Sequence, residues 1–274
     1  MFAALLIVST LAVACAVLSI PVVLRRWAFI GEGIGHSAFG GAGTAWIAAL
    51  LIPSLDQDWA PYLFVVIFCL ATALGIGWLS RSQRVHSDTA IGVFMVAALA
   101  WGFVAQQIYA HARHGATPAW FDDLLIGQMR PISTSSALAS AAVCVGIVLI
   151  MVMLNKEIIA YCFDPLTART SGVREGFVHY LLMLLLALVI VIGVRVAGGL
   201  LVTALLVLPG ATALLVGRRL QWVMVASVVA ALIGAIGGLL IHAQWRFLPV
   251  GPSIVLILVI EFAIAYVAAR RQPL

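Results

Sequence analysis

Nine apolar runs divide the sequence into segments of nearly equal length, and they lie at about 2–24, 34–54, 60–80, 89–110, 133–154, 177–194, 197–217, 221–243 and 253–269; only the last contains a charged residue, Glu261. An apolar helix of about 20 residues spans the hydrocarbon core of a bilayer. The pattern therefore predicts an all-α, polytopic transmembrane bundle of about nine spans. The count falls to eight if one of the segments between 177 and 217 is re-entrant or broken, because only Arg195 and Gly198-Gly199 separate them.

The composition excludes a soluble globular protein. Hydrophobic residues make up 64% of the 274 residues and charged residues only 9%, whereas a soluble domain carries about a quarter charged residues. Nine spans with short loops use up the whole chain, so we expect a single transmembrane domain over residues 1–274. Any soluble chemistry must come from partner proteins.

The positions of the basic residues predict the orientation in the membrane. Alternating the nine spans places eleven Lys and Arg residues on one side and four on the other. The larger set is Arg25, Arg26, Arg81, Arg84, Lys156, Arg169, Arg174, Arg218, Arg219, Arg270 and Arg271, and the smaller set is Arg113, Arg130, Arg195 and Arg246. Because cytoplasmic loops are enriched in Lys and Arg, the N-terminus is expected outside and the C-terminus in the cytoplasm. The net charge of +5 then reports orientation and not a nucleic-acid partner.

Glu32 and His36 form the main candidate site, since ionisable residues at membrane depth are costly and usually functional. Their spacing of four residues puts a carboxylate and an imidazole on one face of a helix. If the helix runs on from Arg26, His36 lies roughly 15 Å beyond it, near the middle of the bilayer. One such pair offers a transition metal two ligands where it prefers four or more. A homodimer would supply two carboxylates and two imidazoles, which suit zinc, manganese or ferrous iron. The alternative is a hydrogen bond that only satisfies two buried polar groups at a tight helix crossing.

Other polar residues have simpler interpretations. Glu261 lies nine residues before Arg270, about 13 Å inside by helical rise, so it is a possible secondary polar site with no partner that we can name. His111 and His114, with Asp122 and Asp123 nearby, are expected in a solvated outer loop. His179 and His242 are at span ends and are expected at the membrane interface.

The chain lacks the motifs of an enzyme. Its single lysine, Lys156, is flanked by Asn155 and Glu157, so there is no phosphate-binding loop ending in Lys-Ser or Lys-Thr. No H-E-x-x-H or G-x-S-x-G motif occurs. We expect a non-enzymatic subunit. The loop 155–176 is predicted to be structured, with a short helix that starts at Asp164-Pro165 and stops at Gly172.

Four motifs, in order along nearly the whole chain, resemble the permease subunit of the ABC-type zinc, manganese and iron importers. Gly31-Glu32-Gly33-Ile34-Gly35-His36 resembles the family's G-D-A-I-S-H, and Phe163-Asp164-Pro165 to Gly172 resembles F-D-P-x-x-A-x-x-x-G. The stretch from Gly199 to Ala213 resembles G-x-L-L-V-x-A-L-L-x-x-P-A-A-T-A. The stretch from Pro249 to Leu256 resembles P-T-G-P-x-I-V-L.

The resemblance implies a multi-pass protein of the bacterial inner membrane, with no tightly bound cofactor, that carries a divalent metal ion. It implies three partners: a second copy of the chain, cytoplasmic ATP-binding subunits that hydrolyse ATP, and an extracytoplasmic metal-binding protein. The metal ligands would be Glu32, where the family has Asp, and His36. Contacts with the ATPase, through a short cytoplasmic coupling helix, would come from Leu208, Pro209, Gly210, Ala211, Arg218 and Arg219.

Two alternatives from other classes remain at this point. One is a self-contained secondary carrier or channel in which Glu32 and His36 relay protons. The other is a membrane enzyme, such as a metal-dependent hydrolase.

Overall fold

The structure is a computed structural model that describes residues 2–52, 59–82, 85–113, 134–217, 219–245 and 247–270. All regular structure in these ranges is helical. The long helices are α1 (Phe2–Leu24), α2 (Ile30–Leu51), α3 (Ala60–Arg81), α4 (Ser87–Ala112), α6 (Thr134–Met153), α9 (Glu175–Ala197), α10 (Gly199–Val216), α11 (Leu220–Gln244) and α12 (Val250–Arg270). Two short helices, α7 (Asn155–Phe163) and α8 (Pro165–Thr170), lie between α6 and α9. The predicted all-α fold is confirmed.

Eight of the long helices are apolar enough and long enough to cross a membrane. The ninth, α2, has 22 residues, which matches the length needed to span, but its glycines and its ionisable pair lower its hydropathy. The segment between 177 and 217 is two separate helices, and Gly198 divides them with a φ of 86°. Only glycine adopts this conformation without strain, so the break is sharp and both helices keep spanning length.

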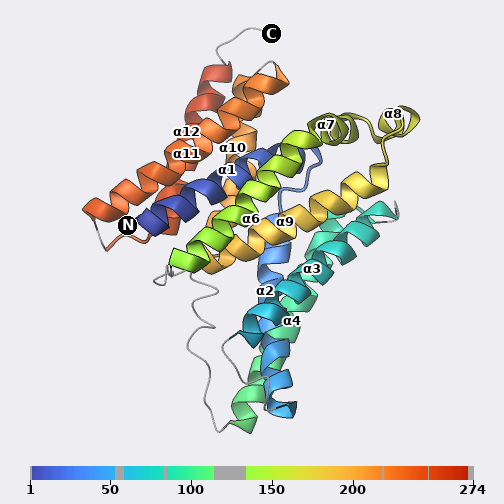
Figure 1. The fold of residues 1–274 in the computed structure, drawn as a ribbon, viewed down its shortest axis with the longest axis vertical. Helices are drawn as coiled ribbons and strands as arrows, with labels where there is room; N and C mark the ends of the chain where they lie inside the picture. Colours follow the sequence, from blue (N-terminus) through green and yellow to red (C-terminus); the bar gives the residue numbers. More distant parts are fainter. Residues whose placement is uncertain are drawn as a thin grey trace.

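The helices form two parts that meet at α2 and α3 (Figure 1). Helices α1, α6 and α9 run side by side, α10 and α11 pack against α1, and α12 packs against α10 and α11. Helices α2, α3 and α4 form a bundle that extends away from the rest (Figure 1). Helix α2 contacts α9 and α10, and α3 contacts α9, so both helices join the two parts. Helix α2 is the most enclosed helix of the bundle.

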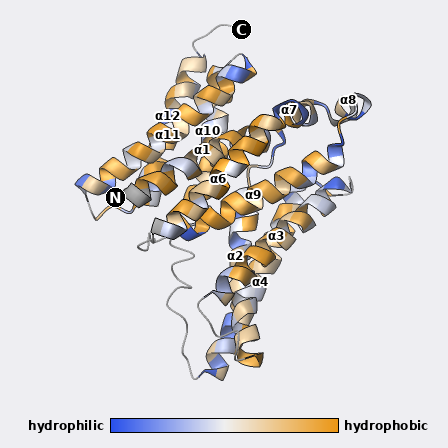
Figure 2. Ribbon diagram, in the orientation of Figure 1, coloured by the Kyte–Doolittle hydropathy of each residue, from blue (hydrophilic) through white to orange (hydrophobic). Residues whose placement is uncertain are grey.

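The outward faces are apolar, as a lipid environment requires. Figure 2 shows hydrophobic colouring along most helices and hydrophilic colouring mainly at their ends. Trp59 and Trp78 lie near opposite ends of α3, Trp222 and Trp245 near opposite ends of α11, and all four are 52–69% exposed. Tryptophan is enriched at the two membrane–water interfaces, so this arrangement fits helices that cross the bilayer.

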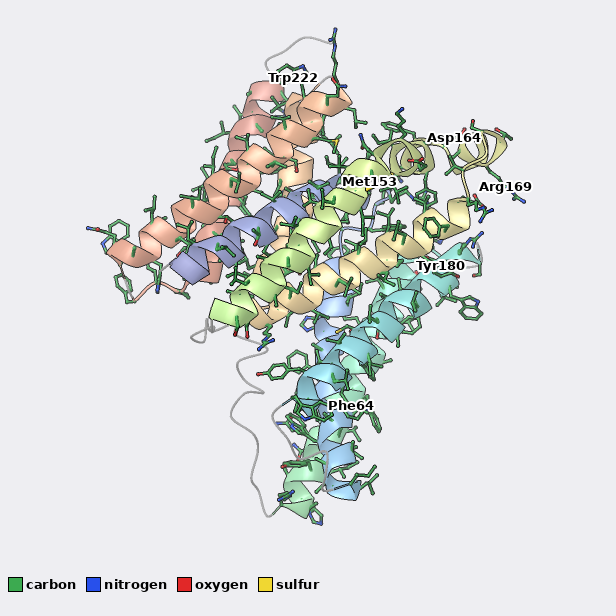
Figure 3. All side chains as sticks on the ribbon, in the orientation of Figure 1. Phe64, Met153, Asp164, Arg169, Tyr180 and Trp222 are labelled. Carbon is green, nitrogen blue, oxygen red and sulfur yellow. The ribbon has the colours of Figure 1, made fainter. Side chains whose placement is uncertain are left out.

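Small residues allow α2 to approach its neighbours closely. A Cβ added at Gly41 would lie 2.6 Å from Val65 Cα and 3.0 Å from the Phe64 carbonyl oxygen of α3. Figure 3 shows Phe64 on that helix. Small residues that bring backbones together are a common basis of helix association in membranes, and here they hold α2 against α3.

The loop between α6 and α9 is structured, as predicted. Helix α8 starts at Pro165, and Gly172, with a φ of 86°, follows it at the predicted stop. Helix α7 was not predicted, because Asn155, Lys156 and Glu157 read as the start of a polar loop. Figure 3 places Asp164 and Arg169 in this α7–α8 segment.

Candidate metal site

The predicted pair forms on the first two turns of α2. His36 Nε2 donates a hydrogen bond of 3.1 Å to Glu32 Oε1, since a carboxylate can only accept. The two side chains are 45% exposed for Glu32 and 30% exposed for His36. Fifteen of the 22 residues of α2 are buried. The pair therefore lies on a narrow exposed stripe of a helix that is otherwise enclosed.

Helices α9 and α10 flank the stripe on one side. Gly35 lies against Ile190 and Val194 of α9, and Gly31 lies against Thr203 and Leu206 of α10. These contacts hold the first two turns of α2 in place against α9 and α10. The carboxylate and the imidazole thus project from a part of α2 that is packed against two other helices.

One chain offers an incomplete site for a metal ion. Among the described residues, no group of three or more His, Cys, Asp or Glu side chains could hold a metal. Glu32 and His36 supply one carboxylate and one imidazole, and a divalent transition metal prefers at least four donors. No third carboxylate, imidazole or thiolate of the described residues joins the pair, and a second copy would provide a matching pair.

The helix assumed in the depth estimate for His36 is interrupted, and the depth itself stays a prediction. The estimate assumed a helix running on from Arg26, but Arg26 has a φ of 57° and α2 begins at Ile30. Residues 25–29 form a turn in which the Trp27 amide donates to the Val22 carbonyl. Helical rise therefore counts only from Ile30, which gives about 9 Å to His36.

The turn at residues 25–29 is held by a buried polar cluster that the sequence did not reveal. Tyr161 of α7 donates its hydroxyl to His179 Nδ1 at 2.7 Å, and His179 Nε2 donates to the Gly77 carbonyl of α3 at 2.9 Å. The Arg25 guanidinium stacks 4.5 Å from the centre of the Tyr161 ring, and Trp27 meets His179 edge to face at 5.5 Å. The cluster joins the ends of α1, α3, α7 and α9 just ahead of α2.

Two details of this cluster follow from burial. His179 lies near the start of α9, the span end where the sequence predicts it; the residue is 4% exposed and both ring nitrogens are bonded inside the protein. Burial raises the pKa of the Tyr161 phenol to about 12, and the nearby Arg25 charge only partly offsets that effect. The phenol is therefore protonated at physiological pH and remains a donor to His179.

The predicted ATPase-contact residues lie in two different environments. Leu208, Pro209, Gly210 and Ala211 are inside α10, and both Pro209 and Gly210 are buried. A Cβ on Gly210 would lie 2.8 Å from backbone atoms of Ser19 in α1, so this glycine permits a close helix contact. The separate coupling helix expected between Pro209 and Arg219 is not formed, since α10 continues to Val216 and α11 begins at Leu220.

Arg219 remains available at this end of the molecule. It is exposed ahead of α11, whereas Arg218 lies outside the described residues. A shallow groove of about 560 Å³ lies beside it, lined by Val216, Gly217, Arg219, Trp222, Val225, Ala226 and Val229. Figure 3 shows Trp222 at the end of the molecule where α11 starts.

The remaining polar candidates do not join the site. Glu261 has both carboxylate oxygens buried, with no hydrogen-bond partner among the described residues. His242 Nδ1 donates to the Leu248 carbonyl at 2.7 Å, which accounts for it structurally. His111 is exposed in the last turn of α4, while His114, Asp122 and Asp123 lie outside the described residues.

Comparison with known proteins identifies the family. A model described as the ABC 3 transport family matches residues 1–269. The chain belongs to the ABC 3 transport family. An ABC 3 relative, a manganese transport system membrane protein of Halalkalibacterium halodurans, is 30% identical over 258 residues, covering 94% of this chain and 83% of the relative. A probable iron transport system membrane protein of Haemophilus influenzae is 33% identical over 240 residues, covering 85% of this chain and 82% of the relative.

Solved structures of the same class share the fold. PsaBC from Streptococcus pneumoniae in complex with Fab matches with a TM-score of 0.77 and 25% identity, covering 96% of this chain and 89% of that chain. A metal-chelate type ABC transporter in an inward-facing conformation matches with a TM-score of 0.70 over 99% of this chain and 87% of that chain. At 15% identity, the second likeness supports the fold alone.

ABC 3 membership settles the class that the sequence left open. The chain is a multi-pass membrane subunit of an ABC transport system in the bacterial inner membrane, and it is not an enzyme. The resemblance found from four motifs is confirmed. The alternatives of a self-contained carrier and of a membrane enzyme are not supported.

Proposed function

We propose that this ABC 3 subunit is the permease of an ATP-driven importer of divalent transition-metal ions, and that two copies form the path for the metal. The observation that carries the proposal is the Glu32–His36 pair on the exposed stripe of α2. Relatives of the chain are named as manganese and iron transport proteins, which favours manganese or iron as cargo.

The homodimer follows from the number of donors. Each chain presents one carboxylate and one imidazole, so two chains related by a two-fold axis present four donors to one ion. Ionisable groups at membrane depth avoid lipid, which gives the exposed stripe of α2 a reason to face a second copy. The transported ion is then held at a seam between subunits.

Transport also needs partners. Cytoplasmic ATP-binding subunits would supply the energy, and an extracytoplasmic metal-binding protein would deliver the ion. Of the predicted ATPase contacts, exposed Arg219 is best placed, together with Arg218 beside it in sequence. The metal ligands must bind the ion better in one conformation than in the other, because only a difference in affinity allows release.

The test is metal uptake by the complex reconstituted in liposomes with its ATP-binding subunits. We expect Glu32→Gln and His36→Ala to abolish ATP-dependent Mn²⁺ uptake while assembly and basal ATP hydrolysis persist, because each variant removes one donor per chain. His111→Ala, which changes an exposed histidine at the far end of α4, is the matched control and should transport normally. Normal uptake by either site variant would rule out the ligand role.

A further inference from the structure

Phe29 is an exposed aromatic residue next to the metal ligands. It precedes the first residue of α2, and its carbonyl accepts the first helical hydrogen bond, from the Gly33 amide, at 3.0 Å. The residue is 63% exposed, whereas the next residue, Ile30, and Trp27, two residues before it, are at most 2% exposed. At the start of α2, the side that carries Phe29 is therefore exposed, whereas the side that carries Ile30 is buried.

That exposed side is the stripe that carries the ligands. Residues three and seven positions apart lie on one face of an α-helix, so Phe29 shares its face with Glu32 and His36. Ionisable side chains at membrane depth do not face lipid. If the stripe is turned away from lipid at Glu32 and His36, then Phe29, one turn away, is turned away from lipid as well.

Phe29 also lies between the ligands and one end of the path. It is the last residue of the turn at residues 25–29, at the end where Arg25, Tyr161 and the Arg81–Glu175 ion pair gather. The distribution of basic residues predicts that this end is cytoplasmic. A metal ion leaving Glu32 and His36 toward the cytoplasm would therefore have to pass the phenyl ring.

We propose that Phe29 from two copies forms an apolar gate that closes the metal path on the cytoplasmic side of the ligands. The inference rests on the proposed homodimeric metal site. Apolar constrictions block ions by excluding water, and a divalent ion sheds its hydration shell only where ligands replace it. Two phenyl rings at the axis supply no such ligands, so the ion stays on Glu32 and His36 until the gate opens.

Helix α10 is positioned to move the gate. Thr203 and Leu206 contact Gly31, two residues after Phe29, and the same helix ends at Val216 beside the groove that Arg219 lines. A shift of α10 at its Val216 end would therefore displace the start of α2. Opening would separate the two rings without displacing the rest of α2 from α3.

The first test is passive leak in the reconstituted complex without ATP. We expect Phe29→Ala to speed Mn²⁺ entry into empty liposomes by about tenfold or more, which corresponds to a barrier lower by about 1.4 kcal/mol. Phe29→Leu keeps an apolar seal and should stay tight. Phe177→Ala removes a phenylalanine with 59% exposure at the start of α9, and should stay tight as well. Tight Phe29→Ala liposomes that still contain assembled complex would overturn the gate.

The second test is cross-linking, which does not depend on the alanine variant folding. Phe29→Cys places two thiols at the axis, and the native cysteines Cys15, Cys69, Cys144 and Cys162 are all buried. A copper oxidant should join two Phe29→Cys chains through a disulfide and stop transport, and a reductant should restore it. Phe177→Cys is the control and should not cross-link. Absence of the disulfide would place Phe29 away from the axis.

The two proposals can fail separately. If Glu32→Gln and His36→Ala abolish uptake but the Phe29 variants neither leak nor cross-link, the gate is wrong and the importer stands. If Phe29→Cys cross-links while the Glu32→Gln and His36→Ala variants take up metal normally, the proposed metal site is wrong and the proposed interface between the two copies is supported.

Discussion

Glu32 occupies the position where the motif that this segment resembles has aspartate, and the difference has a chemical consequence. The longer side chain keeps the charge and the donor oxygen but extends the reach by one methylene. In this chain the extra length lets Oε1 meet His36 Nε2 of the same helix at 3.1 Å. At the proposed metal site, binding of the ion would replace this hydrogen bond.

We expect Glu32→Asp to change the metal preference while retaining transport. The shorter carboxylate would lose the contact with His36 and leave more room between two facing chains, which alters the fit for ions that differ in size and in preferred geometry. The measurement is Mn²⁺ uptake in the presence of competing Zn²⁺ or Fe²⁺, compared between Glu32→Asp and the native chain. An identical competition profile would show that the length of the side chain does not set selectivity.

Individual residues also show where sequence reasoning reached its limit. Glu32 and His36 could be paired from their spacing, because both lie on one helix. His179 could not, because its partners Tyr161 and Gly77 come from α7 and α3 and meet it only in the folded chain. Gly210 reads as part of a contact motif, and only the position of Ser19 in α1 reveals its packing role.

At the scale of elements, helix positions were predictable because lipid demands about 20 apolar residues per span. The start of α2 was the main error. The charge on Glu32 and the glycines around it interrupt the apolar run, so the run begins at residue 34 although the helix begins at Ile30. Hydropathy detects contact with lipid, and α2 is enclosed by α3, α4, α9 and α10.

This enclosure makes α2 sensitive to added volume. We expect Gly41→Val to destabilise the protein by about 1–3 kcal/mol, the usual cost of overpacking, because the new Cβ would meet the backbone of α3 at 2.6 Å. Gly92→Ala in α4 is the control, since nothing lies within 4 Å of its added Cβ. The midpoint of thermal unfolding in detergent reports both variants. Equal midpoints would contradict the tight α2–α3 contact.

The whole molecule combines a lipid-facing exterior with one polar stripe that a single chain leaves uncovered. Helix α10 contacts Gly31 of α2 beside the stripe, and its Val216 end lines the groove beside Arg219. A movement caused by ATP-binding subunits at that groove could therefore reach the proposed metal site and the proposed gate through one rigid element. The fold class and the family were accessible from sequence, whereas this connection required the three-dimensional arrangement.

The central claim is that two copies of this chain share one metal ion through Glu32 and His36. Equilibrium dialysis of the purified, assembled complex against Mn²⁺ tests it most directly, with bound metal and protein chains counted in the same sample. The account predicts one ion for every two chains, and loss of that ion in His36→Ala. One ion for every chain, or the same stoichiometry in His36→Ala, would contradict it.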